Sequence, residues 1–194
     1  MGTSSSKLKR IPNAQELIEE TGFSVAHILR LHERFESLDK NETGELRPED
    51  LETVRELDMN PIGDRIVNAF FPPGRDTLDF PSFVRILAHF RPSDTNRPKD
   101  ATQEPANSRT GKLRFVFQLY DLDKDGKISR FELLQVLRAM LGLQVTEEQL
   151  QSIAERAIQE ADMDSDDAIS FDEFKKSLEK VDIEHKMSIR RFLK

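Results

Sequence analysis

Cysteine and tryptophan are absent from this 194-residue chain, and tyrosine occurs only once. Without cysteine there are no disulfides, no thiolate metal sites and no cysteine nucleophiles. No apolar run approaches the ~20 residues that span a bilayer, and the N-terminus has no apolar signal-peptide core. Acids outnumber bases, 36 to 29, and the formal net charge of −7 argues against binding to a nucleic-acid backbone. We therefore expect a soluble, cytoplasmic protein without a nucleic-acid partner.

Amphipathic helical stretches dominate what is present. Thirteen phenylalanines and a hydrophobic content of 37% provide enough apolar surface for one or two small cores. Apolar residues recur at helical spacing, whereas no long stretch alternates as a strand would. The helical segments include 24–38, 62–71, 83–90, 113–120, 131–141 and 147–161. The sequence predicts an all-α fold with strands of only two or three residues.

Composition divides the chain near residue 100. Residues 92–111 contain three prolines and no large apolar residue, which is typical of a linker. We expect two helix-rich lobes, a basic N-terminal segment with a first helix, and an amphipathic C-terminal tail. The expected ranges are 1–23 for the N-terminal segment, 24–91 for the N-lobe, 92–111 for the linker, 112–181 for the C-lobe and 182–194 for the tail.

The segment DLDKDGKISRFE at 121–132 matches the EF-hand calcium loop at every informative position. Carboxylates stand at positions 1, 3 and 5, a backbone carbonyl at 7, a water-holding residue at 9 and a bidentate glutamate at 12. The predicted ligand residues are Asp121, Asp123, Asp125, Lys127, Ser129 and Glu132. Gly126 permits the sharp turn at position 6. Carboxylates about 4 Å apart repel one another by roughly 1 to 4 kcal/mol. A divalent cation bound among them makes the electrostatic energy of the cluster favourable.

A second match lies at 162–173, DMDSDDAISFDE. Its predicted ligand residues are Asp162, Asp164, Asp166, Ala168, Ser170 and Glu173. Asp167 replaces the turn glycine, and aspartate adopts the left-handed backbone conformation at some cost in strain. We therefore expect weaker calcium binding here than at 121–132, and two bound Ca²⁺ in the distal pair of loops.

The two proximal loops are degraded versions of the same pattern. Loop 39–50 keeps the first aspartate and the turn glycine, but its closing residue is Asp50, one C–C bond (~1.5 Å) shorter than glutamate. We expect no calcium there, with weak magnesium binding left open. Loop 71–82 has no ligand at its first, third or closing position and should be metal-free. These proximal helices can still fold by burying phenylalanines, namely Phe70, Phe71, Phe80, Phe83 and Phe90.

Four helix–loop–helix units in two lobes, with short two-strand ribbons between paired loops, define the EF-hand superfamily. Particular runs then resemble the calcineurin B homologous proteins, within the calcineurin B-like EF-hand proteins. These runs are ETGFS at 20–24, NPIGDRIVNAFFP at 60–72, LAHFRP at 87–92, FQLYDLDKDGKISR at 117–130 and KMSIRRFLK at 186–194. The resemblance covers nearly the whole chain.

The resemblance implies a regulatory subunit of plasma-membrane Na⁺/H⁺ exchangers. Such a regulatory protein binds an amphipathic juxtamembrane helix of the exchanger and supports its activity and pH regulation. The resemblance also implies inhibition of the phosphatase calcineurin, through its catalytic subunit. A calcineurin B-type subunit or general calcium sensor, and a calcium buffer without a dedicated partner, remain alternatives. An enzyme is not expected, because the chain has no nucleophile elbow, glycine-rich phosphate loop or histidine metal pair.

The first residues, MGTSSS, match the pattern for N-myristoylation at Gly2. One myristoyl chain binds membranes only marginally, and Lys7, Lys9 and Arg10 would add attraction to an anionic surface. We expect the chain at the cytoplasmic face of the plasma membrane as well as in the cytoplasm. Leucine-rich runs at 134–143 and 174–183 fit nuclear-export spacing, but helical core packing accounts for them better. The resemblance to the calcineurin B homologous proteins implies nuclear export for some members, so nuclear shuttling stays an alternative. The tail at 182–194 is a candidate helix for occupying the target groove when no partner is bound.

Overall fold

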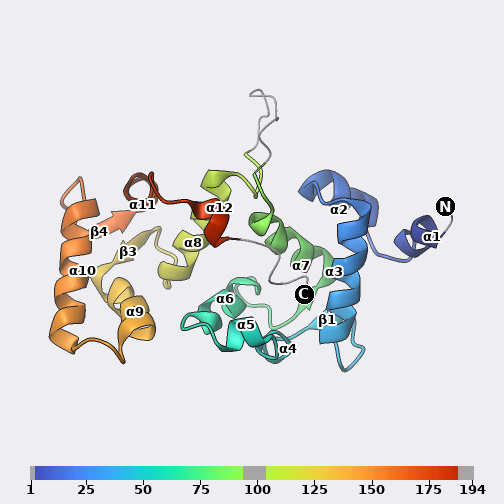
Figure 1. Cartoon of the computed structure of the whole chain (residues 1–194), viewed down its shortest axis with the longest axis horizontal. Coiled ribbons are helices and arrows are strands. Elements are labelled where there is room, and N and C mark those ends of the chain that lie inside the picture. The colour runs from blue at the N-terminus through green and yellow to red at the C-terminus, as the bar shows by residue number, and fades with distance from the viewer. Residues whose placement is uncertain (1–2, 94–103, 188–194) are drawn as a thin grey trace. The chain divides into compact units, whose positions relative to one another are not determined.

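The computed structural model describes residues 3–93 and 104–187, and Figure 1 traces its elements. The predicted lipidation site Gly2, residues 94–103 of the predicted linker and residues 188–194 of the predicted tail lie outside the described residues. Within the described ranges, no helix combines the length and apolar character needed to cross a bilayer. Two compact units are formed. The N-terminal unit comprises the described residues up to 112 together with 184–187, and the C-terminal unit comprises 113–183.

The N-terminal unit is a pair of helix–loop–helix units preceded by two short helices. Its helices are α1 (Thr3–Leu8), α2 (Ala14–Thr21), α3 (Val25–Leu38), α4 (Pro48–Glu52), α5 (Arg55–Asp58), α6 (Gly63–Ala69) and α7 (Phe80–Leu87), with a 3-10 turn at Ala88–Phe90. Strands β1 (Glu45–Leu46) and β2 (Leu78–Asp79) pair antiparallel, with Leu46 opposite Leu78. This ribbon joins the two proximal loops.

Aromatic side chains hold the core of the N-terminal unit. Phe35 packs edge-on against Phe80 and Phe83, with ring centroids 5.5 Å apart in both pairs. Phe70 is fully buried, whereas Phe71 and Phe90 are half-buried against the same core. Because burying one such side chain contributes roughly 1.5 to 3 kcal/mol, this core can form without a metal ion.

The C-terminal unit is the second pair of helix–loop–helix units. Its elements are α8 (Arg109–Tyr120), β3 (Lys127–Ser129), α9 (Arg130–Leu141), α10 (Glu147–Ala161), β4 (Ala168–Ser170), α11 (Phe171–Ser177) and α12 (Ile183–Lys186); the boundaries between the units fall within α8 and α12. Strands β3 and β4 pair antiparallel with Ile128 opposite Ile169. The predicted all-α EF-hand fold, with two-strand ribbons between paired loops, is confirmed.

Both described ends of the predicted linker are fastened within the N-terminal unit. The Asn107 amide donates to the Pro92 carbonyl at 2.8 Å, and the Ser93 hydroxyl donates to the Asn107 carbonyl at 2.8 Å. Lys112 is fully buried, and its ammonium donates to the carbonyls of His89 and Arg91. These bonds join residues 92–93 to residue 107, and residues 89–91 to Lys112, within the N-terminal unit.

Candidate metal centre

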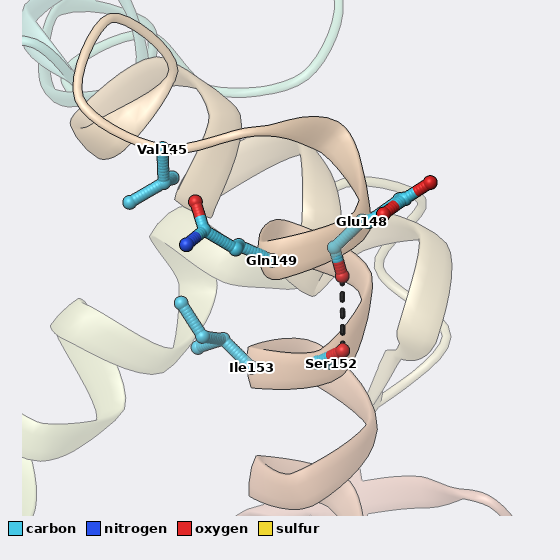
Figure 2. A pocket seen from close by; sticks show the side chains of 5 residues that line it. All are labelled: Val145, Glu148, Gln149, Ser152 and Ile153. Atoms are coloured by element: carbon cyan, nitrogen blue, oxygen red, sulfur yellow. Dashed lines mark hydrogen bonds between the residues drawn. The ribbon is translucent and has the colours of Figure 1, made fainter.

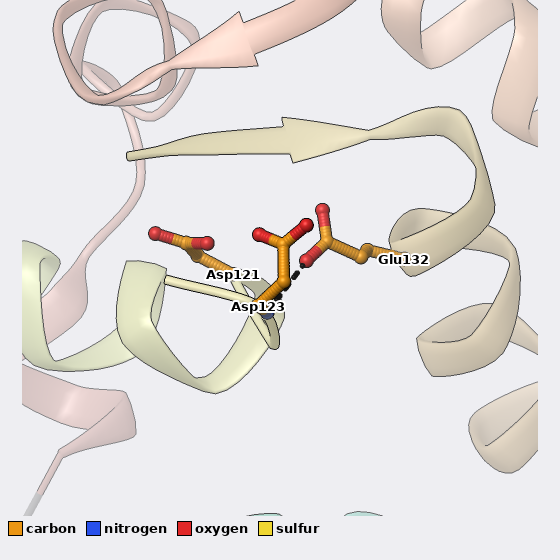
Figure 3. Close-up of side chains that lie close together, drawn as sticks. All are labelled: Asp121, Asp123 and Glu132. Carbon is orange, nitrogen blue, oxygen red and sulfur yellow. Dashed lines mark hydrogen bonds between the residues drawn. The ribbon is translucent and has the colours of Figure 1, made fainter. Parts of the chain in front are cut away.

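In loop 121–132 the closing glutamate is tied to both ends of the loop. One Glu132 oxygen accepts from the backbone amides of Leu122 (2.7 Å) and Asp123 (3.2 Å). The other accepts from the amide and hydroxyl of Ser129, both at 2.8 Å. Ser129 also caps α9, so the capping box that starts this helix is the same structure that closes the loop. Figure 3 shows Glu132 facing the Asp123 carboxylate.

The first aspartate shapes the turn. The Asp121 carboxylate accepts from the amides of Asp125 at 3.1 Å and Gly126 at 3.0 Å. These bonds hold a backbone that twice enters the left-handed region, at Lys124 (φ 59°) and at Gly126 (φ 89°). Glycine at the second of these positions avoids the steric cost of a side chain.

Negative oxygens gather at the middle of this loop. Asp121, Asp123 and Glu132 each offer a carboxylate oxygen, and these oxygens lie within 4.8 Å of one another. Asp121 and Glu132 are only 5% and 4% exposed. Burial, together with the charges of Glu132 and Asp125, raises the pKa of Asp121 above its usual value. Burial also acts to raise the pKa of Glu132, but hydrogen bonds from Ser129 and the loop amides lower it overall. The cluster therefore favours occupation by a hard divalent cation.

Asp125, at position 5, is the one predicted carboxylate ligand of this loop that the cluster does not include. Its carboxylate accepts from the Lys127 amide at 2.8 Å. The equivalent bond in the second distal loop runs from the Ala168 amide to Asp166 at 3.0 Å. The two distal loops thus share the hydrogen bond from the amide at position 7 to the carboxylate at position 5, although Asp166 belongs to its carboxylate cluster and Asp125 does not.

Loop 162–173 has the same closure. One Glu173 oxygen accepts from the Met163 amide at 2.7 Å, and the other from the amide and hydroxyl of Ser170 at 2.8 Å each. Hydrogen bonds from Ser170 and Met163 lower the pKa of Glu173 to about 2. Carboxylate oxygens of Asp162, Asp164 and Asp166 lie within 4.8 Å of one another. Burial and the neighbouring Asp166 and Glu173 charges raise the pKa of Asp164.

Asp167 occupies the turn position where the first loop has glycine. Its φ is 64°, and its amide donates to Asp162 at 2.9 Å. The residue is thus held in the left-handed region that the turn requires of it. Non-glycine residues adopt this conformation at a cost of order 1 kcal/mol.

Lys127 makes a contact that the spacing of the loops did not lead us to predict. From β3, its ammonium donates to the carboxylate of Asp166 in the opposite loop. A signal was available, since pairing Ile128 with Ile169 brings Lys127 opposite Ser170 of the second loop. The hydrogen bond to Asp166 and the charge of that carboxylate raise the pKa of Lys127, and the same hydrogen bond lowers the pKa of Asp166.

The proximal loop 39–50 keeps the turn but not the closure. The Asp39 carboxylate accepts from the amides of Thr43 (3.0 Å) and Gly44 (2.6 Å), as Asp121 does in its loop. Burial acts to raise the pKa of Asp39, but these hydrogen bonds lower it overall. Asp50 accepts from the Arg47 amide at 2.8 Å, and in the described part of the chain no hydrogen bond joins its carboxylate to residues 40–41. The loop holds its shape without a closing ligand.

Loop 71–82 has lost the turn as well. Gly74 is left-handed (φ 79°), at position 4 of the loop, but Asp76 at position 6 is not. Asp79, at position 9, accepts from the Ser82 amide at 2.9 Å and caps α7. Its carboxylate therefore caps the start of α7. The loop has no carboxylate at positions 1, 3, 5 or 12.

A surface hollow of about 480 Å³ opens beside the start of α10 in the C-terminal unit. It is lined by Val145, Glu148, Gln149, Ser152 and Ile153. Figure 2 shows the side chains of Val145, Gln149 and Ile153 on one side of the helix, while the Ser152 hydroxyl donates to the Glu148 carbonyl at 2.9 Å. The hollow is partly apolar and lies outside both loops.

The paired loops and their ribbon define this chain as an EF-hand protein, and residues 111–179 match the EF-hand domain pair family. The calcineurin B subunit of Naegleria gruberi is 36% identical over 190 residues, 98% of this chain and 99% of the relative. The calcineurin B subunit of Candida glabrata is 32% identical over 98% of each chain. The type 1 calcineurin B subunit of Dictyostelium discoideum is 34% identical over 90% of this chain and 89% of the relative. The chain belongs to the calcineurin B family of EF-hand proteins, which confirms the calcineurin B-like resemblance.

Proposed function

We propose that this chain is a non-enzymatic, calcium-binding subunit of calcineurin B type that holds two Ca²⁺ in its distal loops. The observation that carries the proposal is the closure shared by Glu132 and Glu173. Each carboxylate is bonded both to the start of its loop and to the serine at position 9. Both glutamates are only 4% exposed, and this burial together with their hydrogen bonds supports the role of closing ligands.

Calcium would supply the positive charge that these loops lack. In the first loop the oxygens of Asp121, Asp123 and Glu132 would hold it, with Asp125 and the Lys127 carbonyl beside them. The matching set in the second loop is Asp162, Asp164, Asp166, the Ala168 carbonyl and Glu173, with Ser129 and Ser170 at position 9. Because the carboxylates repel one another without a cation, binding free energy adds to the stability of the C-terminal unit.

Isothermal titration calorimetry of the whole chain tests this proposal. The unmodified chain should bind two Ca²⁺. Glu132→Gln and Glu173→Gln should each bind one, because each change removes a closing charge while keeping the side chain's size. Asp50→Asn is the matched control and should still bind two. Two undiminished sites in either glutamine variant would refute the assignment.

The partner we propose first is the calcineurin catalytic subunit. Its support is the identity of 32–36% to proteins named as calcineurin B subunits, over nearly the full length of this chain and of those relatives. The binding element would be an amphipathic helix, since EF-hand pairs bind such helices by their apolar faces.

A second candidate is the juxtamembrane helix of a Na⁺/H⁺ exchanger. It is supported by the runs at 60–72 and 186–194 that resemble the calcineurin B homologous proteins. The proximal loops also favour it, because a calcineurin B subunit is expected to hold four calcium ions, whereas Asp50 and loop 71–82 leave two loops without closure.

Capture on two immobilised peptides separates the candidates. One peptide carries the helix by which the calcineurin catalytic subunit holds its regulatory partner, and the other carries the exchanger's juxtamembrane helix. Preferential capture on either identifies the target class, and repeating the assay with chelator shows whether calcium is sensed or structural. Capture on neither would favour the calcium-buffer alternative, in which added calcium exposes little apolar surface to a reporter dye.

We also propose that Gly2 is myristoylated and brings the chain to the cytoplasmic face of the plasma membrane. The support is the MGTSSS pattern with Lys7, Lys9 and Arg10 close by. Co-expression with N-myristoyltransferase should add one acyl chain by mass, and Gly2→Ala should abolish it along with flotation on anionic vesicles. The second leucine-rich run gives no support to nuclear export, because its Phe174 and Ile183 are buried, at 8% and 5% exposure.

A further inference from the structure

Lys127 lies in loop 121–132 and contacts loop 162–173. Its backbone carbonyl occupies position 7 of loop 121–132, while its ammonium reaches the carboxylate of Asp166, position 5 of loop 162–173. The two side chains are 45% and 30% exposed, so the pair sits at the surface of the C-terminal unit. No other lysine or arginine pairs with Asp162, Asp164 or Asp166 among the ion pairs of the described residues.

We propose that the Lys127 ammonium competes with calcium for Asp166 at loop 162–173, and that it lowers this site's affinity for calcium. The proposal rests on calcium binding at that loop, as proposed above. Asp166 is a predicted ligand there, so a Ca²⁺ ion and the ammonium both require the same carboxylate. Calcium must therefore displace the lysine or share Asp166 with a neighbouring positive charge.

The asymmetry between the loops supports this assignment. In loop 162–173 one of the three clustered carboxylates is already paired with a cation. In loop 121–132 the cluster is Asp121, Asp123 and Glu132, and none of these takes part in an ion pair of the described residues. The clustered carboxylates of the first loop therefore meet calcium without an ion-paired cation, whereas one of the three in the second loop is already paired.

The size of the effect follows from the exposure of the pair. Exposed ion pairs contribute little, and their usual strength corresponds to about a two- to fivefold change in an equilibrium constant. Removing the ammonium should therefore tighten calcium at loop 162–173 about two- to fivefold more than removing a nearby lysine that touches no ligand. The gain should shrink in high salt, because salt screens both charges.

Lys176 provides the matched control. Its ammonium lies near the same loop, but it donates to the sulfur of Met163 at 3.0 Å and not to a clustered carboxylate. Lys176→Gln changes the net charge near the site by the same amount as Lys127→Gln. Lys127→Met is the second variant, since it keeps the aliphatic stem on the ribbon if glutamine disturbs folding.

The experiment is a calcium titration of each full-length chain followed by NMR, with the amides of Gly126 and Asp167 reporting the two sites separately. In Lys127→Gln and Lys127→Met, the calcium affinity of loop 162–173, reported by Asp167, should be about two- to fivefold higher than in Lys176→Gln. The calcium affinity of loop 121–132, reported by Gly126, should change no more than in Lys176→Gln. Equal tightening in all variants would reduce the effect to net charge and overturn the proposal. Unchanged or weakened calcium binding at loop 162–173 would mean that Lys127 only stabilises the pairing of the two loops, and would overturn the proposal. If Asp167 reports no calcium even in the unmodified chain, the proposed function fails first.

Discussion

Loops 39–50 and 121–132 have nearly the same backbone and different closures. In both, the first aspartate accepts from the amides at positions 5 and 6, and the residues at positions 4 and 6 are left-handed. Only in the distal loop does the twelfth residue also reach the amides at positions 2 and 3. The first aspartate and the left-handed turn residue therefore suffice to shape such a loop, whereas we propose that metal binding also needs the closing glutamate.

Transferring the proximal closure to the distal loop should have the largest effect. Glu132→Asp shortens the closing side chain by one C–C bond, so its carboxylate can no longer bond Ser129 and reach Leu122 together. We expect calcium affinity at this site to fall about 100-fold, which corresponds to about 2.7 kcal/mol. Calorimetry measures it, and an affinity within about threefold of the unmodified chain would contradict the role given to closure.

Removing the first aspartate of the proximal loop should come next. Asp39 is 8% exposed and accepts charge-assisted bonds from Thr43 and Gly44. Asp39→Ala should destabilise the N-terminal unit by about 2 kcal/mol, because two amides lose an ionised acceptor. Urea unfolding in chelator measures this loss. Asp50→Ala is the control and should cost about 1 kcal/mol, because among the described residues the Asp50 side chain accepts a single hydrogen bond, from the Arg47 amide at the start of α4. Equal losses would remove the distinction between shaping and closing residues.

Exchanging the turn residues of the distal loops should have a smaller effect. Gly126 has φ 89° with open space where a Cβ would stand, and Asp167 has φ 64°. Gly126→Asp should therefore cost about 1 kcal/mol of stability from backbone strain alone, and Asp167→Gly should recover part of such a cost. Thermal unfolding in chelator gives both values, and opposite signs would show that the left-handed turn does not limit these loops.

In the calcium-free chain, Glu173 and Asp164 should affect the pH dependence of folding stability in opposite ways. Its folded pKa of about 2 lies below its ordinary 4.5, so its contribution to stability is present above pH 4.5 and is lost as the pH falls toward 2. Asp164 acts in the opposite sense, because its raised pKa makes protonation in the folded state favourable. Glu173→Gln should thus flatten the loss of stability between pH 4.5 and 2, measured by urea midpoints. An unchanged slope would mean that other carboxylates dominate the acid response.

What could be predicted from the sequence was local. The ligand positions of 121–132 and 162–173 follow a fixed spacing within each loop. The helix expected over 147–161 has the same bounds in the structure, and it starts with a capping box formed by Thr146 and Gln149. The pairing of Ile128 with Ile169 followed because each stands at position 8 of its loop. Closure by Glu132 and its absence at Asp50 could be predicted from side-chain length alone.

What could not be predicted depends on contacts between distant residues. The helix expected over 62–71 runs from Gly63 to Ala69, after a turn in which the Asn60 side chain accepts from the Ile62 amide at 3.1 Å. Gly63 is required because a Cβ there would lie 2.0 Å from the Leu57 carbonyl oxygen. The burial of Lys112 depends on the carbonyls of His89 and Arg91, which lie 23 and 21 residues earlier and accept from its ammonium.

Native mass spectrometry of the unmodified chain in excess calcium measures the difference between the two halves most directly. We predict a dominant species with two retained Ca²⁺ ions, because only the distal loops have a closing glutamate. A dominant species with no retained calcium, or with four ions, would contradict that assignment.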